Sequence, residues 1–179
     1  MKKIITFIMI TFLAMAFSPF ASYTGEMGTT IAHSKDFEKM KDLVGVWNGK
    51  GTEMGKEMEQ LKVIYELTSA GNAIVERFAA GTPHEMVTVY HDYNGKLTMT
   101  HYCSLGNQPH MELRNPGEKN NMTFELSEKA PGLVSLNETH MHTLAIVVNG
   151  KESITQTWTL YDKGVKKKDV VVHLVRTNI

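Results

Sequence analysis

Alternating apolar and polar positions dominate this sequence after an initial hydrophobic run and one short helical pattern. Such period-two runs recur over residues 46–51, 61–67, 73–78, 84–91, 96–104, 110–114, 122–126, 133–138, 142–148, 153–161 and 169–176. Turn-forming Gly, Pro, Asn and Ser residues separate them at regular spacing, which indicates a meander of short antiparallel strands. About ten such strands must protect their edges, and closure into a barrel does so. The sequence therefore predicts an all-β, antiparallel up-and-down barrel of about ten strands, with a two-sheet sandwich as the alternative.

A β-hairpin is expected at the centre of this meander. Two runs rich in Val, Thr and Tyr flank Asn94-Gly95, a pair that suits the tight turns of hairpins. Strand alternation then places two sets of side chains on one face of the hairpin. These are His84, Met86, Thr88 and Tyr90 from the first arm, and Leu97, Met99, His101 and Cys103 from the second. An imidazole, a phenol, a thiol and thioethers on one otherwise apolar face make this the best candidate site in the sequence.

One short amphipathic helix precedes the strands. Phe37, Met40 and Val44 recur at helical spacing behind possible N-caps at Ser34 or Asp36. Gly45 is expected to end this helix. The chain therefore reads as one helix leading into the first strand of a single domain over residues 23–179, with no repeat or linker that indicates a second domain.

The first 22 residues have the pattern of a secretory signal peptide. Lys2 and Lys3 precede an apolar run over residues 4–17, which is too short to span a bilayer comfortably. We expect cleavage near Ala21 or Ser22 and export to the periplasm or the extracellular space, without stable membrane insertion afterwards. An uncleaved membrane anchor is the alternative.

Charge and cysteine content narrow the classes of function. The 19 basic and 19 acidic side chains are scattered, so there is no basic stripe of the kind that binds nucleic acid. Lys166-Lys-Lys168 is read as a solvated turn before the last strand. Cys103 is the only cysteine, which excludes a disulfide within one chain.

The order of these elements resembles the calycin superfamily of lipocalins and fatty-acid-binding proteins. A Gly-x-Trp stands on the first expected strand, at Gly45-Val-Trp47, and in that superfamily this motif closes one end of the barrel. The longer run over residues 45–51 is similar to the Gly-x-Trp-x-Gly-x-Gly of nitrobindin-type haem-binding barrels. That likeness implies a haem-ligating histidine near the C-terminus, where His173 lies, although the Tyr-Pro pair expected after the glycines is absent.

The whole chain most resembles uncharacterised secreted bacterial lipocalin-like proteins. The likeness rests on five segments: residues 86–91, 97–103, 106–109, 140–142 and 155–158. It covers most of the predicted mature domain. It implies a lipocalin-like barrel and brings no established function with it.

A small-molecule pocket is the function that these residues favour most. A barrel of this size holds a cavity, and good pockets are mostly apolar with a few polar groups that orient the ligand. The expected lining is Met86, Tyr90, Met99, His101, Cys103 and Trp158. His101 and Tyr90 would orient a polar group of a small, largely apolar ligand.

Metal or haem binding is the main alternative. His101 and Cys103 are two residues apart, as are His140 and His142, so two such pairs meeting inside a barrel would supply nitrogen and sulfur ligands for zinc or copper. Haem would instead take one of His101, His140, His142 or His173 as its iron ligand.

Two further interpretations remain beside these. Each histidine taken singly is more often a hydrogen-bonded structural residue than a ligand. An enzyme is the weakest alternative, because the sequence has no nucleophile elbow, phosphate loop or dinucleotide fingerprint, and no catalytic residue is assigned. Cys103 and the nearby His101 have the residue types of a thiol nucleophile and its base, but the sequence lacks a following helix that would activate the thiol.

Overall fold

The computed structural model describes residues 32–53 and 56–177, so the predicted signal peptide over residues 1–22 lies outside the described part. The elements in chain order are α1 (Lys35–Lys41), β1 (Gly45–Glu53), β2 (Lys56–Thr68), the 3-10 turn η1 (Ser69–Gly71), β3 (Ala73–Phe78), β4 (Met86–Tyr93), β5 (Lys96–Tyr102), β6 (His110–Leu113), β7 (Asn121–Leu126), β8 (His140–Gly150), β9 (Ser153–Asp162) and β10 (Val165–Arg176). None of the described helices is long and apolar enough to span a membrane.

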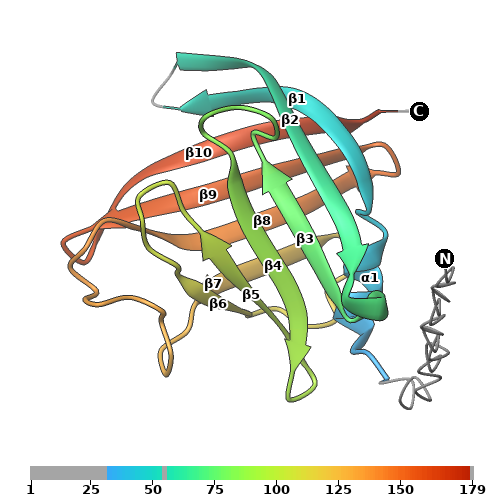
Figure 1. The fold of residues 1–179 in the computed structure, drawn as a ribbon, viewed down its shortest axis with the longest axis horizontal. Coiled ribbons are helices and arrows are strands. Elements are labelled where there is room, and N and C mark those ends of the chain that lie inside the picture. Colours follow the sequence, from blue (N-terminus) through green and yellow to red (C-terminus); the bar gives the residue numbers. More distant parts are fainter. Residues whose placement is uncertain (1–31, 54–55, 178–179) are drawn as a thin grey trace, which may run out of the picture. The chain divides into compact units, whose positions relative to one another are not determined.

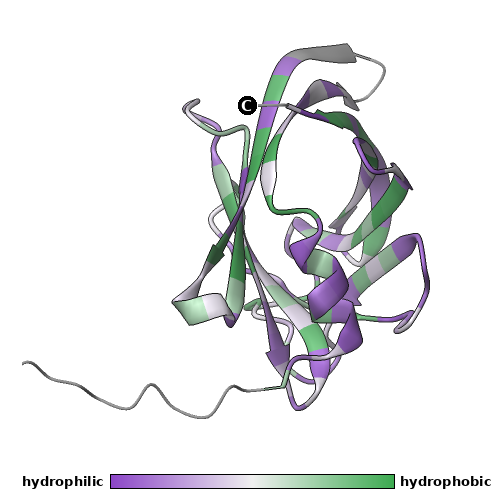
Figure 2. Cartoon of the chain, turned by 90° about the vertical axis from the view of Figure 1, so that its right-hand side faces the viewer, coloured by the Kyte–Doolittle hydropathy of each residue, from purple (hydrophilic) through white to green (hydrophobic). Residues whose placement is uncertain are grey.

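The ten strands form one closed antiparallel barrel (Figure 1). Each strand pairs with its neighbours in the sequence, and β1 closes the barrel against β10, where Trp47 lies opposite Arg176. The expectation of an up-and-down barrel with one short helix is confirmed. The physical reason is visible in Figure 2, where hydrophobic and hydrophilic residues alternate along the strands. Strand alternation directs the apolar set inward and leaves the other set in solvent.

The central hairpin has the predicted turn and register. Asn94 and Gly95 have φ angles of 52° and 74°, so both central residues of the turn are left-handed, as a type I′ turn requires. Thr88 then pairs with His101, and Tyr90 pairs with Met99. All four side chains are buried inside the barrel.

Helix α1 packs across one end of the barrel. The Ser34 hydroxyl accepts a hydrogen bond from the Phe37 amide (3.0 Å), which confirms Ser34 as the N-cap. Ser34 is itself fixed to Asp92, at the β4–β5 turn, through its amide (2.6 Å) and its hydroxyl (2.7 Å). Phe37 and Met40, one turn apart, are fully buried in the barrel core. The helix therefore closes this end of the barrel as a hydrophobic plug.

Three sequence-based expectations are wrong. The helix ends at Lys41 with Asp42 as its C-cap, not at Gly45, which is the first residue of β1. Residues 133–138 do not form a strand but belong to the long loop between β7 and β8, where the Val134 side chain is 98% exposed. Pro131, Gly132 at a φ of 68° and the backbone hydrogen bond from Glu138 to Ser135 impose turns that outweigh the β-prone pattern. Lys166–Lys168 lie within β10 rather than in a turn, since β10 begins at Val165.

Trp47 and Arg176 join the two strands that close the barrel, at the same end as α1. The Trp47 indole N–H donates to the Leu43 carbonyl (2.8 Å), and the Arg176 guanidinium lies 4.2 Å from the centre of the indole ring. Arg176 also donates to the carbonyls of Val44 (2.8 Å) and Asp42 (2.6 Å). Strand β10 is thereby fastened to the segment that links α1 to β1.

Gly49 on β1 allows the close approach of β1 and β10, the two strands that close the barrel. A Cβ atom at this position would lie 1.9 Å from the carbonyl oxygen of His173, on the neighbouring strand β10. We therefore expect Gly49→Ala to lower the free energy of unfolding by about 1–3 kcal/mol, because the β1–β10 backbones must move apart. Urea unfolding measures the change. Gly150→Ala is the matched control, since no heavy atom lies within 4 Å of its added Cβ, and equal losses in the two variants would contradict this account.

Candidate functional site

A cavity of about 500 Å³ opens at the end of the barrel opposite α1. Its apolar wall includes Leu61, Phe78, Met86, Met141, Trp158 and Val170. Its mouth is bounded by the β3–β4 and β5–β6 connections, which contribute Thr82 and Leu105. His101 and Cys103 are the cavity residues with the most distinctive chemistry.

A larger hollow of about 1060 Å³ lies at the other end, beside α1. Most of its lining residues are charged or polar in type, such as Lys35, Asp36, Lys119 and Lys151, but Leu43, Trp47, Val148 and Ile154 add apolar surface. No described side chain in this lining carries a buried polar atom without a partner. The smaller cavity is therefore the stronger candidate for a specific site.

His101 lies in the wall of the smaller cavity with only 2% of its surface exposed. Its Nδ1 is 2.9 Å from the Thr88 hydroxyl, and its ring packs against the Trp158 indole with the ring centres 4.5 Å apart. Burial lowers the pKa of His101 to about 4, so the imidazole is neutral at neutral pH. Its Nε2 is buried. This nitrogen is left without a hydrogen-bond partner in a residue that lines the cavity.

A buried carboxyl group, Glu76, lies inside the barrel on β3 with no exposed surface. Its two oxygens accept hydrogen bonds from the Tyr90 hydroxyl (2.5 Å) and from Gln156 Nε2 (2.7 Å). Burial raises the pKa of Glu76, while hydrogen bonds from Tyr90, Gln156 and Tyr65 act in the opposite direction. Burying a carboxyl group costs free energy unless hydrogen-bond donors surround it, and here such donors reach both of its oxygens.

Gln156 connects this carboxyl group to the cavity wall. Its Nε2 donates to the Tyr65 hydroxyl as well as to Glu76, and its Oε1 accepts the Trp158 indole N–H (3.2 Å). Trp158 in turn packs on His101. The polar network inside the barrel therefore fixes the orientation of the aromatic ring that supports His101.

Cys103 is a thiol in an apolar wall. Burial is the main reason why its pKa is raised, although hydrogen bonds from Ser104 and Leu105 oppose this shift. Since the thiolate is the nucleophilic form, a raised pKa gives a thiol of low reactivity. Cys103 contributes shape and polarisability to the cavity rather than nucleophilic chemistry.

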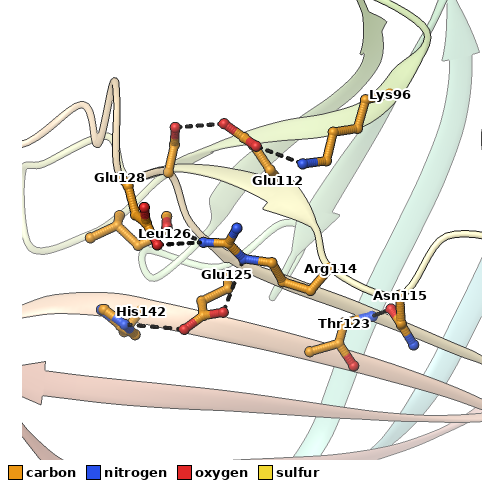
Figure 3. Close-up of polar contacts among 10 residues, drawn as sticks. Lys96, Glu112, Arg114, Asn115, Thr123, Glu125, Leu126, Glu128 and His142 are labelled. Atoms are coloured by element: carbon orange, nitrogen blue, oxygen red, sulfur yellow. Dashed lines mark hydrogen bonds and ion pairs between the residues drawn. The ribbon is translucent and has the colours of Figure 1, made fainter.

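His140 and His142 form a separate pair at the start of β8. His140 Nδ1 lies 2.7 Å from the Glu138 carbonyl, and His140 Nε2 lies 3.2 Å from His142 Nδ1. The Nε2 of His142 faces Glu125 at 4.0 Å, within a polar row that also includes Arg114 (Figure 3). A register irregularity between Met141 and Thr143 turns this part of β8 out of regular alternation.

The structure brings together four of the six predicted ligand-binding residues. Met86, His101, Cys103 and Trp158 all line the smaller cavity. Tyr90 and Met99 are fully buried in the core and do not line it. The Tyr90 hydroxyl, predicted to orient a ligand, is instead bound to Glu76.

The four residues predicted to bind metal are not gathered into one group. Within residues 32–53 and 56–177, no set of three or more His, Cys, Asp or Glu side chains has the arrangement of a metal site. His173, the haem ligand suggested by the nitrobindin likeness, is exposed on β10 and lies 3.1 Å from the Thr155 hydroxyl. A haem inside the barrel therefore has no ligand from His173.

Glu76 and Gln156 are the site residues that sequence reasoning missed. Both carried a signal, because Glu76 alternates with Ile74 and Phe78, and Gln156 alternates with Ile154 and Trp158. A lone polar residue on the apolar face of a strand indicates a buried polar group that needs partners. The partners themselves come from other strands, so the sequence did not show the network.

Comparisons with known proteins agree on the fold. No protein-family model matches the sequence, and no curated protein matches it. A protein of unknown function from the DUF3598 family of Nostoc punctiforme superimposes with a TM-score of 0.54 and 14% identity, over 77% of this chain and 49% of its own. Rv2717c from M. tuberculosis superimposes with a TM-score of 0.53 and 12% identity, over 82% of this chain and 100% of its own. The chain thus spans about half of the DUF3598 protein, and at these identities the likeness shows the barrel fold alone.

Proposed function

We propose that this barrel binds a small, mostly apolar molecule in the cavity beside His101. The observation that carries the proposal is the Nε2 atom of His101, which is buried at an apolar wall without a partner. Leaving such a polar atom unpaired costs about 1–3 kcal/mol. A ligand whose polar group reaches this nitrogen would recover that free energy while its apolar part fills the cavity.

The cavity supports this proposal by its size and its lining. Its volume of about 500 Å³ lies in the range typical of sites for small organic ligands. Met86 and Met141 give part of the wall a flexible, polarisable surface that adapts to irregular apolar shapes. A mostly apolar wall of this kind selects a class of ligand by burial, and its few polar groups, among them His101, orient the ligand by hydrogen bonds.

N-Phenyl-1-naphthylamine, an apolar dye that fluoresces on burial, tests the proposal. We expect saturable binding with a blue-shifted emission, and at least a tenfold weaker affinity (about 1.4 kcal/mol) for Met86→Trp, because the larger ring occupies the cavity. Val148→Trp is the matched control, because Val148 is also partly buried but lines the hollow at the other end. Equal affinities of the two variants, both folded by circular dichroism, would place the dye elsewhere and refute the proposal.

The zinc or haem alternative stays a prediction from the sequence. Native mass spectrometry and an absorption spectrum of the protein, purified without chelators, test both interpretations at once. A bound organic molecule is the result expected from the proposed function. Stoichiometric metal, or a Soret band, would favour the alternative. The variants His101→Ala and His140→Ala would then show which histidine coordinates the metal or the haem iron.

We propose further that the barrel works outside the cytoplasm as a lipocalin-like member of the calycin superfamily. The support is the signal-like pattern over residues 1–22, which lies outside the described residues, together with the closed barrel and its Gly-x-Trp seam. Mass spectrometry of the protein from the exported fraction of its own cells should find a new N-terminus near residue 22. A protein that keeps Met1 in the cytoplasmic fraction would contradict export.

A further inference from the structure

The histidine pair at the start of β8 brings two ring nitrogens close together. His140 Nε2 lies 3.2 Å from His142 Nδ1, and the ring centres are 5.4 Å apart. Side chains two residues apart on a regular strand leave the backbone about 6.6 Å from each other. Here the register of β8 is irregular between Met141 and Thr143, and a bulge of this kind re-aims a side chain. Neither histidine lines the cavity beside His101.

Each ring of the pair has a further contact that fixes its orientation. His140 Nδ1 lies 2.7 Å from the Glu138 carbonyl oxygen. Because a carbonyl oxygen only accepts, this nitrogen carries the hydrogen, and in the neutral ring Nε2 presents its lone pair to His142. The His142 ring stacks on Tyr161 with the ring centres 4.0 Å apart. Its Nε2 faces a carboxyl oxygen of Glu125 at 4.0 Å (Figure 3).

The neutral pair leaves one polar group unsatisfied in either proton arrangement. With its proton on Nδ1, His142 donates to His140, and the lone pair of its Nε2 then faces the carboxyl group of Glu125. With its proton on Nε2, His142 suits Glu125, but two lone pairs then face each other across 3.2 Å. A cation between the two lone pairs satisfies both sides. Arg114 pairs with the other oxygen of Glu125, so it leaves Oε1 to His142.

The surroundings of the pair are those of metal-binding histidines. Such a histidine ordinarily donates its second ring N–H to a backbone carbonyl or a carboxylate. The Glu138 carbonyl has this place beside His140, and the Glu125 carboxyl group faces the corresponding nitrogen of His142. The side chain of His142 is 23% exposed, so the pair can be reached from solvent.

The spacing of the two nitrogens fits a zinc ion. Two ligands on tetrahedral zinc, with bonds of about 2.0–2.1 Å, lie about 3.3–3.4 Å apart. The observed separation of 3.2 Å is close to this value. Imidazole is also a ligand type that zinc favours. Since no set of three or more His, Cys, Asp or Glu side chains in the described part of the chain has the arrangement of a metal site, the remaining coordination positions fall to water.

We propose that His140 Nε2 and His142 Nδ1 chelate a zinc ion, with water in the other positions, at a site separate from the cavity. Glu138 and Glu125 are positioning residues, because they direct the two lone pairs to the metal. Two protein ligands give exchangeable binding, in contrast to structural zinc sites, which are closed by four. The inference does not depend on the proposed function, since the other two metal ligands predicted from the sequence line the cavity.

Calorimetric titration with zinc chloride tests the inference on protein stripped of metal by a chelator that is then removed. We expect one zinc ion per chain and at least tenfold weaker binding for His142→Ala, because a single imidazole cannot chelate. His140→Ala should give a similar loss. His173→Ala is the matched control, since it removes an exposed histidine of β10 and should leave the zinc affinity unchanged. A wild-type protein that binds no zinc, or equal losses in His142→Ala and His173→Ala, would overturn the inference.

Nitrogen-15 NMR of the wild-type protein keeps the inference testable if the variants do not fold. At neutral pH we expect zinc to shift the resonances of His140 Nε2 and His142 Nδ1 most strongly. The ring of His101 should be unaffected. Changes centred on His101 would place the metal in the cavity and overturn the inference.

Binding of N-phenyl-1-naphthylamine distinguishes this inference from the proposed function. Saturating zinc should leave the affinity for the dye unchanged, because neither histidine of the pair lines the cavity. Competition between zinc and the dye would contradict a separate site. A protein that binds zinc through the pair but never binds the dye would retain the inference and count against the proposed function alone.

Discussion

Replacing Trp47 by alanine is expected to lower the free energy of unfolding by about 3–5 kcal/mol, the range found for large aromatic residues removed from protein cores. Trp47 is 1% exposed, and its ring packs beneath the Arg176 guanidinium at 4.2 Å. Its loss leaves a cavity and removes the N–H that the Leu43 carbonyl accepts at 2.8 Å. Equilibrium unfolding in urea measures the effect. We expect it to be the largest of the effects described here, because the same side chain joins α1, β1 and β10.

Two control variants distinguish the specific role of Trp47 between β1 and β10 from the general effect of losing an aromatic ring. Tyr93→Ala removes a ring that is 63% exposed and should change stability by less than about 1 kcal/mol. Trp47→Phe keeps most of the packing and loses the indole N–H, so its loss should be intermediate. A value for Trp47→Ala as small as that of Tyr93→Ala would show that the Gly-x-Trp motif does not hold the barrel closed.

Acidification is expected to destabilise the barrel through His101. Burial holds the pKa of His101 at about 4, whereas an imidazole ordinarily has a pKa of 6.5. As the pH falls below 6.5, the unfolded chain binds the proton first, so the native state loses free energy relative to it until the pH reaches about 4. The contribution of His101 is thus fully present above about pH 6.5. Its complete loss is worth about 3 kcal/mol at about 1.4 kcal/mol per pKa unit.

The pH effect must be measured as a difference, because Glu76 works in the opposite direction. Its pKa is raised by burial, so protonation of Glu76 on acidification favours the native state. Urea unfolding of the wild-type protein and of His101→Asn between pH 7 and pH 4 isolates the histidine. We expect the stability advantage of the wild-type protein over this variant to shrink steadily as the pH falls. A difference that is constant with pH would show that His101 does not titrate with a lowered pKa.

Most of the barrel could be predicted from the sequence alone, without knowledge of the tertiary structure. Alternating polarity and frequent turn residues are local signals, and they predicted strands whose apolar faces must meet. Asn94-Gly95 predicted the turn and the register of the central hairpin, because few residue pairs adopt two left-handed conformations. Ser34 was also predictable as a possible helix cap, because capping is a local interaction within the first turn of the helix. The pattern failed over residues 133–138, where the turn chemistry of the loop outweighed β-propensity.

Such local signals predicted only part of the candidate site. His101, Cys103 and Met86 were found because they share one face of a single hairpin. Tyr90 lies on that same face, yet it faces Glu76 rather than the cavity. The distinction depends on depth along the barrel axis, which strand alternation does not encode.

Only the tertiary structure decided which polar groups meet. Glu76 and Gln156 are 80 residues apart and come from opposite parts of the strand order, yet they are joined at 2.7 Å inside the barrel. The sequence showed the surrounding strands but not this contact, because closure of β1 against β10 determines which interior side chains face each other. Only the tertiary structure also shows that His101 Nε2 is buried without a protein partner. Local chemistry thus determined the strands and the hairpin, and the tertiary structure of the barrel determined the network and the unpaired nitrogen on which the proposed function rests.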